Sequence, residues 1–327
     1  MDIYFQTVYG KLNELIESGR CVSYDFDSES GSVHHMFICR EIPFLIDGEQ
    51  YYDIITPYGY GGPLIVNANE GKKQELCKEF GAAFAAYCER ERIISEFVRF
   101  HPVMNNAVDF QDIYHPIYMR KTLGTNLSDY DDPVQSEFSK SCRKNIRKAL
   151  NNGVSYRVTE APDSIDGFYD IYRSTMKRDH ASKFYFFDRK YFDNLINLIR
   201  DNVLFIEALY EEKTIAAGLF LLSDGVIHVH LSGTLSDYLY LSPAYILRYA
   251  AALWGKEHGY RLIHHGGGTS NSEDNSLYLF KKQFSVNTAF EFYVGKKIWN
   301  KEVYDAAVRI SGNEHGDFFP QYRKLDE

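Results

Sequence analysis

The sequence lacks the features that mark several large classes of protein. Its 327 residues contain no run of about 18 apolar residues, so no transmembrane helix is expected. The five cysteines are scattered and none forms a C-x-x-C pair, so we expect neither a disulfide framework nor a metal site. The chain begins Met-Asp with no basic segment before an apolar run, so no secretory signal is predicted and a cytoplasmic location is expected.

Basic residues are fewer than acidic ones. There are 45 acidic residues against 36 basic ones, which gives a net charge of −9 with histidine neutral. A dedicated DNA-binding protein usually carries a basic excess, so DNA is not an expected partner. A local basic groove is still compatible with this balance.

Motifs of several enzyme classes are missing as well. The sequence contains no G-x-S-x-G elbow, no phosphate-binding P-loop and no H-E-x-x-H pair. The run Gly266-Gly267-Gly268 does not continue as a dinucleotide-binding motif, because Asn271 stands where the third glycine would be.

What the sequence does contain is an alternation of strands and helices that occurs twice. A hairpin, an open loop, a helix and a strand follow one another over residues 33–100 and again over 214–268. This repeat of topology predicts two α/β domains, each a mixed sheet with helices on its faces. A polar linker at 126–133 places the boundary between domains 1–133 and 134–327.

A basic helix is expected to open the second domain. Residues 134–151 have a helical apolar period, and five cations fall between positions 140 and 148 on the opposite side. These cations form either a solvated helix face or a contact for phosphate groups, which arginine binds through its fork of N–H donors.

The histidines of the second domain lie on two predicted strands. His228 and His230 share one strand face, where packing or hydrogen bonding is the favoured interpretation over a metal pair. His265 ends a strand just before the triple glycine. Because α/β sheets bind ligands where strand ends open onto flexible backbone, His265 is a candidate substrate-binding residue.

The order of elements in the second half, together with six short motifs, resembles the GNAT acyltransferase fold. Two such domains in tandem are similar to the Fem-type (FemABX) peptidyltransferases, which add amino acids to peptidoglycan precursors. The motifs are residues 52–63 (YDIITPYGYGGP), 99–102 (RFHP), 143–149 (RKNIRKA), 230–234 (HLSGT), 266–268 (GGG) and 279–284 (LFKKQF).

The resemblance implies N-acyl transfer to an amine, and it suggests where the reacting groups lie. The strand 226–234 corresponds to the GNAT strand whose hydrogen bonding is interrupted, so the break is expected at Ser232, Gly233 and Thr234, whose amides would face the developing oxyanion. Lys281 matches a family Phe-Lys position near the donor and is expected to stabilise negative charge there. Tyr278 lies on the helix that in many GNAT enzymes carries a general-acid tyrosine.

The sequence departs from acetyl-CoA users at one point. Between the strand 226–234 and the next helix such enzymes carry a glycine-rich pyrophosphate loop, whereas residues 235–243 read LSDYLYLSP. This loss is similar to the Fem-type pattern, in which the donor is aminoacyl-tRNA. Three functions stay open: aminoacyl transfer to an amine of a peptidoglycan precursor or related amino-sugar compound, acetyl-CoA-dependent N-acetylation of a sugar or small amine, and a non-catalytic binding protein with the same twin fold.

Further candidates for substrate binding come from the remaining motifs. They are two aromatic loop residues that could stack on a base or sugar, two residues at a strand end that could contact a diphosphate, and two arginines of the basic helix: Tyr58, Tyr60, Arg99, His101, Arg143 and Arg147. The expected acceptor is nucleotide- or lipid-linked, and no permanently bound cofactor is expected.

Overall fold

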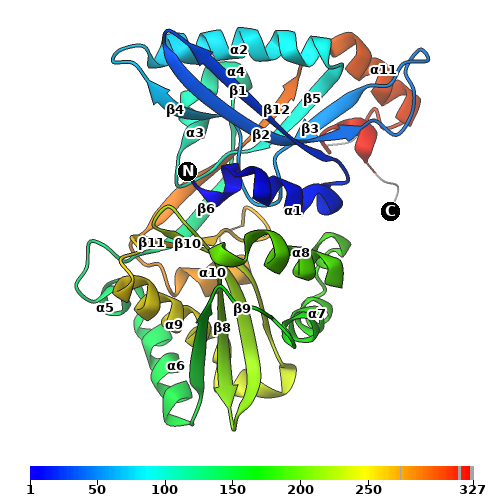
Figure 1. Ribbon diagram of the computed structural model, residues 1–327. Helices are drawn as coiled ribbons and strands as arrows, with labels where there is room; N and C mark the ends of the chain where they lie inside the picture. Colours follow the sequence, from blue (N-terminus) through cyan, green and yellow to red (C-terminus); the bar gives the residue numbers. More distant parts are fainter. Residues whose placement is uncertain (273, 316–317, 325–327) are drawn as a thin grey trace. The chain divides into compact units, whose positions relative to one another are not determined.

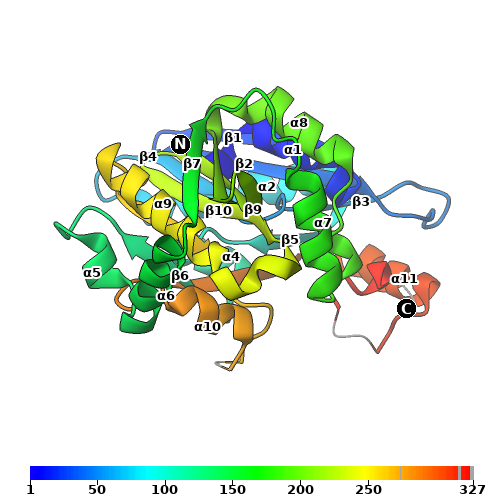
Figure 2. The same ribbon diagram turned by 90° about the horizontal axis from the view of Figure 1, so that it is seen from below.

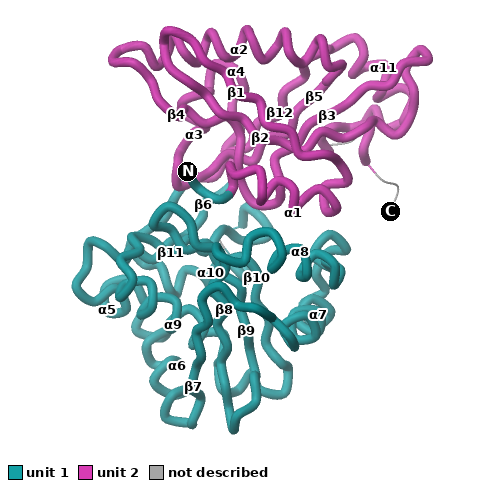
Figure 3. The backbone as a smooth tube through the Cα atoms, viewed as in Figure 1, with its two compact units in different colours: residues 1–3, 120–290 teal, residues 4–119, 291–327 magenta. Residues whose placement is uncertain are grey.

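The computed structural model describes residues 1–272, 274–315 and 318–324, and it divides into two compact units (Figure 3). Unit 1 comprises residues 1–3 and the described residues of 120–290. Unit 2 comprises residues 4–119 and the described residues from 291 onward. The chain passes from one unit to the other within strand β6 (Ile117–Asn126) and again within strand β12 (Ala289–Ile298).

A mixed sheet forms the centre of unit 1, with its strands in the order β6, β11, β10, β9, β8, β7. The strands that follow β6 in the chain are β7 (Ser155–Glu160), β8 (Val203–Tyr210), β9 (Lys213–Ser223), β10 (Val226–Thr234) and β11 (Leu262–Gly266). Strands β10 and β11 are parallel, and the other neighbours are antiparallel. The parallel pair therefore brings two carboxyl ends to one edge of the sheet.

Helices cover both faces of this sheet (Figures 1 and 2). They are α5 (Pro133–Glu137), α6 (Lys140–Asn151), α7 (Phe168–Arg178), α8 (Arg189–Ile199), α9 (Pro243–Glu257) and α10 (Ser276–Lys282). Leu204 and Ile206 of β8 share a core cluster with α6 and α9, whereas Phe205 contacts Phe168 of α7. Because successive side chains of a strand point to opposite faces, α9 and α7 lie on opposite faces of the sheet.

Unit 2 repeats this architecture around a second mixed sheet. Its strands run in the order β1 (Arg20–Ser28), β2 (Gly31–Glu41), β3 (Tyr52–Ile55), β5 (Ile93–Arg99) and β12, and β4 (Leu64–Ala68) pairs with β2. Its helices are α1 (Thr7–Glu17), α2 (Lys73–Arg90), α3 (Asn106–Asp109), α4 (Gln111–Tyr114) and α11 (Lys301–Ser311). Phe80 and Phe84 of α2 pack with Phe37 of β2 in one of its core clusters.

The end of the chain belongs to unit 2. Strand β12 pairs antiparallel with β5, and α11 contributes Tyr304 to a core that also holds Ile42 and Ile94. The buried Asp53 carboxylate accepts hydrogen bonds from Arg323 and from Tyr322 Oη (3.1 Å). This division differs from the expected boundary after residue 133, because pairing with β5 carries the last segment back to unit 2.

The expected helix over 134–151 is interrupted. Phe138 has an extended backbone, α5 ends before it, and α6 begins again where Ser139 Oγ accepts a hydrogen bond from Cys142 N at 3.1 Å. The serine cap restarts the helix, which is the preferred role of serine at that position. No described helix is both long enough and apolar enough to span a bilayer.

Candidate active site

The pairing of β10 with β11 stops part-way along both strands. Val226 pairs with Leu262 and His228 with His264, and no later residues of the two strands are paired with each other. At this level β10 is irregular against β9, between Val229 and Leu231, and β11 is irregular against β6 after His264. The two strands therefore separate toward their carboxyl ends.

The amides beyond this point alternate in direction. Leu235 N donates to Ile215 O of β9 at 2.9 Å, whereas Thr234 N donates to Thr175 Oγ1 of α7 at 2.8 Å. Since successive amides of a strand point to opposite sides, the amide of Gly233 faces β9 and that of Ser232 faces away from it. Of the three candidate amides, that of Ser232 points away from β9, toward the side from which β11 has separated. The amide of Thr234 is already bound by Thr175.

Gly233 has a packing role of its own. A Cβ at this position would lie 2.8 Å from Ile171 O and 2.9 Å from the Cα of Tyr172, both in the backbone of α7. Only glycine allows the helix to approach the strand this closely.

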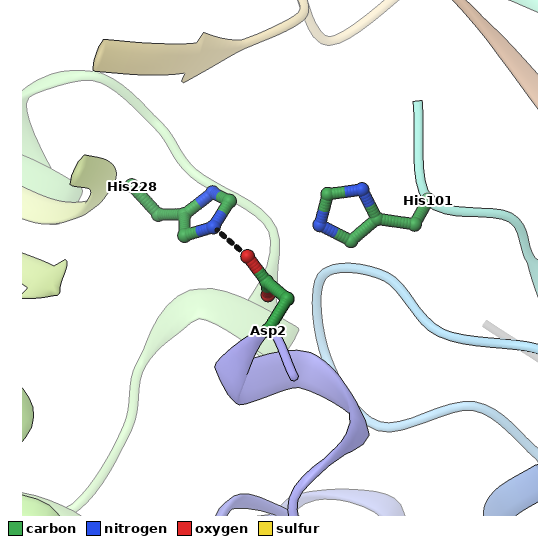
Figure 4. A group of neighbouring side chains, drawn as sticks. All are labelled: Asp2, His101 and His228. Carbon is green, nitrogen blue, oxygen red and sulfur yellow. Dashed lines mark hydrogen bonds and ion pairs between the residues drawn. The ribbon is translucent and has the colours of Figure 1, made fainter. Parts of the chain in front are cut away.

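Three histidines of β10 and β11 have identified hydrogen-bond partners. His228 Nε2 lies 2.8 Å from Asp2 Oδ2, and both side chains are buried (Figure 4). His230 Nε2 lies 2.6 Å from the Tyr191 hydroxyl, and burial with His228 nearby lowers the pKa of His230 to about 3. His264 Nε2 lies 3.0 Å from Thr122 Oγ1. The hydrogen-bonding interpretation of His228 and His230 is consistent with these contacts.

Lys281 reaches the end of β11 from helix α10. Asn275 caps this helix by accepting a hydrogen bond from Tyr278 N at 3.0 Å, and one turn later Lys281 Nζ donates to Gly267 O at 2.7 Å. Burial, together with Arg248 and Arg120, lowers the pKa of Lys281 to about 7.

Arg120 and Arg248 complete a group of cations around Lys281. Arg120 Nη1 donates to Gly268 O at 2.5 Å, next to the carbonyl that Lys281 binds. Arg248, on α9, is 3% exposed and stacks over Phe280 and Phe284, with its Cζ 4.9 Å and 5.4 Å from their ring centroids. No ion pair of these three cations is found among the described residues.

His265 lies against the same cations. Its Nε2 lies 2.8 Å from Thr125 Oγ1, which itself donates to Phe284 O at 2.7 Å, so the ring nitrogen is the donor in the first contact. Burial, Arg248 and Lys281 all lower the pKa of His265 well below its ordinary value. The ring is therefore neutral, and its Nδ1 has no partner in the described part of the chain.

The segment after β10 forms a short helix instead of a glycine-rich loop. Residues Ser236–Leu241 are a 3-10 turn, and α9 then begins at Pro243, which has no N–H. Tyr245 N donates back to Ser242 O at 3.1 Å. Of the first three amides of α9, only that of Ala244 is left to face a phosphate group.

Comparisons with known proteins identify this region. Residues 136–274 match the family described as "Acetyltransferase (GNAT) domain". This part of the chain is similar to GNAT acyltransferase domains. The protein is accordingly an acyltransferase. No functionally curated protein matches the sequence.

Solved structures extend the likeness beyond the GNAT domain to the tandem fold. FemX aligns with a TM-score of 0.70 and 14% identity, over 93% of this chain and 94% of its own. The C-terminal domain of a putative lysylphosphatidylglycerol synthetase from Agrobacterium fabrum aligns with a TM-score of 0.58 and 12% identity, over 95% and 91%. L-PGS from Bacillus licheniformis gives 0.53 and 15%, over 89% and 92%. The predicted fold, two GNAT-like α/β units in tandem, is confirmed.

Within the GNAT domain the two arginines of the basic helix have different surroundings. Arg143 Nη1 donates to Gln135 O at 3.0 Å and also to Phe138 O, so it binds the last carbonyls of α5. Arg147 is exposed and stays a candidate for substrate contact. Tyr278 is half-buried beside Gly268, where it stays a candidate for the general acid.

The candidates of unit 2 gather around one loop. Arg99 donates to Glu17 Oε1 at 2.6 Å and to Thr56 O, so its charge is balanced internally. Tyr60 packs at 5.5 Å from the ring of His101, which is fully buried. Tyr58 accepts a hydrogen bond from the Tyr9 hydroxyl through its backbone oxygen at 2.6 Å. Of these side chains, Tyr58, Tyr60 and Arg99 retain partial exposure.

Sequence reasoning missed Arg120 and Arg248. Arg120 lies in a strand whose neighbours gave no motif, so no local signal marked it. Arg248 did leave a signal: it is the only charge between Pro243 and Gly255 in an otherwise apolar helix. A lone charge in such a run is rarely buried without a purpose.

Proposed function

We propose that the protein transfers an aminoacyl group from aminoacyl-tRNA to an amine of a peptidoglycan precursor or a related amino-sugar compound. The observation that carries the choice of donor is the start of α9. Pro243 lacks an N–H and the Tyr245 amide is already used, so this helix offers few donors for the pyrophosphate of CoA. The tandem fold shared with FemX, and the lysyl group in the name of a second structural neighbour, favour an aminoacyl donor.

The proposed reaction needs an amine, an ester and a place for negative charge. The lone pair of the acceptor nitrogen attacks the ester carbonyl carbon, the N–C bond forms, and the carbonyl oxygen becomes an oxyanion facing the Ser232 amide. Collapse breaks the bond to the terminal ribose oxygen of the tRNA. That oxygen takes up one proton, the nitrogen loses one, and Lys281 stabilises the charge on the departing oxygen.

Basic side chains on α6 support a polyanionic donor. Lys144, Arg147 and Lys148 are exposed on this helix, and none of them forms an ion pair with a described residue. The N-terminus of α6 adjoins α10, since Ser139 N donates to Gln283 O at 2.8 Å. An RNA backbone bound along α6 would thus extend toward Lys281 on α10.

A second candidate is acetyl-CoA-dependent N-acetylation of a sugar or small amine. The description of the matching family favours it, because that family is named for acetyl transfer. The same split between β10 and β11 would serve either donor.

The test supplies the purified protein with radiolabelled aminoacyl-tRNA and a nucleotide- or lipid-linked muropeptide. We expect label to move to the muropeptide in a form stable to mild base, as an amide is and an aminoacyl ester is not. In a parallel reaction with labelled acetyl-CoA we expect no transfer. Transfer of acetyl groups only would replace the first candidate by the second.

A further inference from the structure

The GNAT domain buries more positive charge than its described partners balance. Arg248 is 3% exposed, and its Nη1 makes one long contact, 3.4 Å to Ala244 O. Its Nε is buried with no hydrogen-bond partner in the described part of the chain, and the same holds for Arg120 Nε. A buried guanidinium without a carboxylate is costly and normally has an anionic partner.

Two of the three cations bind consecutive peptide groups. Lys281 binds Gly267 O and Arg120 binds Gly268 O, so the two cationic groups are held on adjacent carbonyls. Arg248 reaches the same place from α9, because Phe284 packs against both its guanidinium and the ring of His265 (6.0 Å between ring centroids). Carbonyl oxygens are weak partners for cations and are readily exchanged for an anion.

Glycine residues allow close packing around these two carbonyl groups. A Cβ at Gly267 would lie 3.1 Å from Arg120 Cδ, and one at Gly268 would lie 2.5 Å from Asn275 Oδ1. The triple glycine thus allows Arg120 and the start of α10 to approach the end of β11. Backbone of this kind commonly surrounds phosphate groups.

We propose that Arg120, Arg248 and Lys281 form a binding site for a phosphate-type oxyanion. Arg120 and Arg248 supply planar N–H forks and Lys281 a compact ammonium, a combination that suits tetrahedral phosphate oxygens. His265, which is neutral, offers its Nδ1 lone pair to a hydroxyl next to that phosphate. That this phosphate belongs to the acyl donor rests on the proposed function; the binding of the anion does not.

Inorganic phosphate is the probe. We expect it to raise the melting temperature of the wild-type protein in a saturable way at constant ionic strength, because a ligand that binds only the folded state stabilises it. Lys281→Met and Arg248→Met should each weaken phosphate binding by about tenfold or more, as expected for loss of one charged hydrogen bond. Lys282→Met, the exposed neighbour of Lys281, is the matched control and should bind like the wild type.

Two readouts keep the outcomes apart. Circular dichroism verifies that each variant is folded, and Arg120→Met provides a third variant should Arg248→Met fail to fold. Equal phosphate binding by the wild type and the folded variants, or none by the wild type, would overturn the site. Competition of phosphate by CoA or by uncharged tRNA then distinguishes the two donors. A saturable phosphate site in a protein that transfers no acyl group would leave the site standing and remove the proposed function.

Discussion

At the scale of single residues, Lys281 combines an unusual environment with a simple contact. Its amine is bound by one carbonyl, and burial together with two nearby guanidinium groups lowers its pKa to about 7. The lysine can therefore serve as a cation toward a departing oxygen and still release a proton at neutral pH.

Replacing Lys281 by alanine should reduce acyl transfer strongly. Loss of a group that stabilises developing charge typically costs about 100-fold or more in turnover. Turnover is measured with the donor that proves active, and Lys282→Ala serves as the control on the same helix. A Lys281→Ala variant that is folded and fully active would remove this lysine from the mechanism.

The depressed pKa of Lys281 also makes a prediction about stability and pH. Below pH 7 the folded protein holds a buried charged amine at a cost, whereas the unfolded chain keeps the proton up to about pH 10.4. Stability of the wild type should therefore rise relative to Lys281→Met as the pH increases from 7 to 9. His265 titrates well below this window and the pKa of Arg248, about 10, lies above it.

Urea unfolding at pH 6.5 and pH 9 measures this difference. The expected result is that the free energy of unfolding of the wild type approaches or exceeds that of Lys281→Met at the higher pH. A difference that stays constant with pH would show that Lys281 is not titrating in this range.

Gly233 makes the third prediction at this scale. Alanine here would place its Cβ against the backbone of α7, which cannot move aside as a side chain would. We expect Gly233→Ala to lower the free energy of unfolding by about 1–3 kcal/mol, the usual cost of overpacking. Ser232→Ala, at the half-exposed neighbouring position, should change the free energy of unfolding by much less.

At the scale of elements, the sequence predicted those strands and helices whose apolar residues recur with a clear strand or helix period. Strand β10 lies over the expected range 226–234, because a run of β-branched and apolar residues after the turn Asp224-Gly225 is a strong local signal. The break at Phe138 was missed, since one extended residue does not disturb an apolar period. The resemblance predicted an interruption in this part of the sheet. That the pairing of β10 with β11 ends after His228 could not be predicted, because it depends on how two strands distant in the sequence are aligned.

The exposed cations of α6 make a prediction about the donor. Lys144→Glu with Arg147→Glu should weaken the use of an RNA donor and reduce its dependence on salt concentration, because fewer counterions are released on binding. The control reverses two exposed cations of unit 2, Lys78→Glu with Arg309→Glu. Transfer rates at several salt concentrations measure the effect, and identical salt slopes for the wild type and the α6 variant would contradict it.

At the scale of the whole molecule, the two units hold separate cores, and unit 2 depends on a contact made by the end of the chain. The buried Asp53 carboxylate is bound by Arg323, Tyr322 and Arg40, whose Nε lies 2.7 Å away. The expected boundary after residue 133 did not foresee this, because no local pattern links Tyr322 to a strand about 270 positions earlier.

Arg323→Met should destabilise unit 2 in particular. Removing one partner of a buried ion pair costs about 3–5 kcal/mol when the remaining charge is left unbalanced, and Arg40 limits that loss here. Scanning calorimetry should show one transition moving to lower temperature, and exposed Arg309→Met should leave the trace unchanged. A uniform shift of the entire trace would show that the units do not unfold separately.

The return of the chain to unit 2 after residue 290 has a consequence for synthesis on the ribosome. Residues 120–290 supply almost all of unit 1 without interruption, so this body can fold while later codons are still being read. Strand β5 emerges early, yet its partner β12 and the arginine that binds Asp53 are translated only after residues 120–290. Unit 2, most of which is made first, is therefore completed second, and the edge of β5 stays unpaired until β12 has been translated.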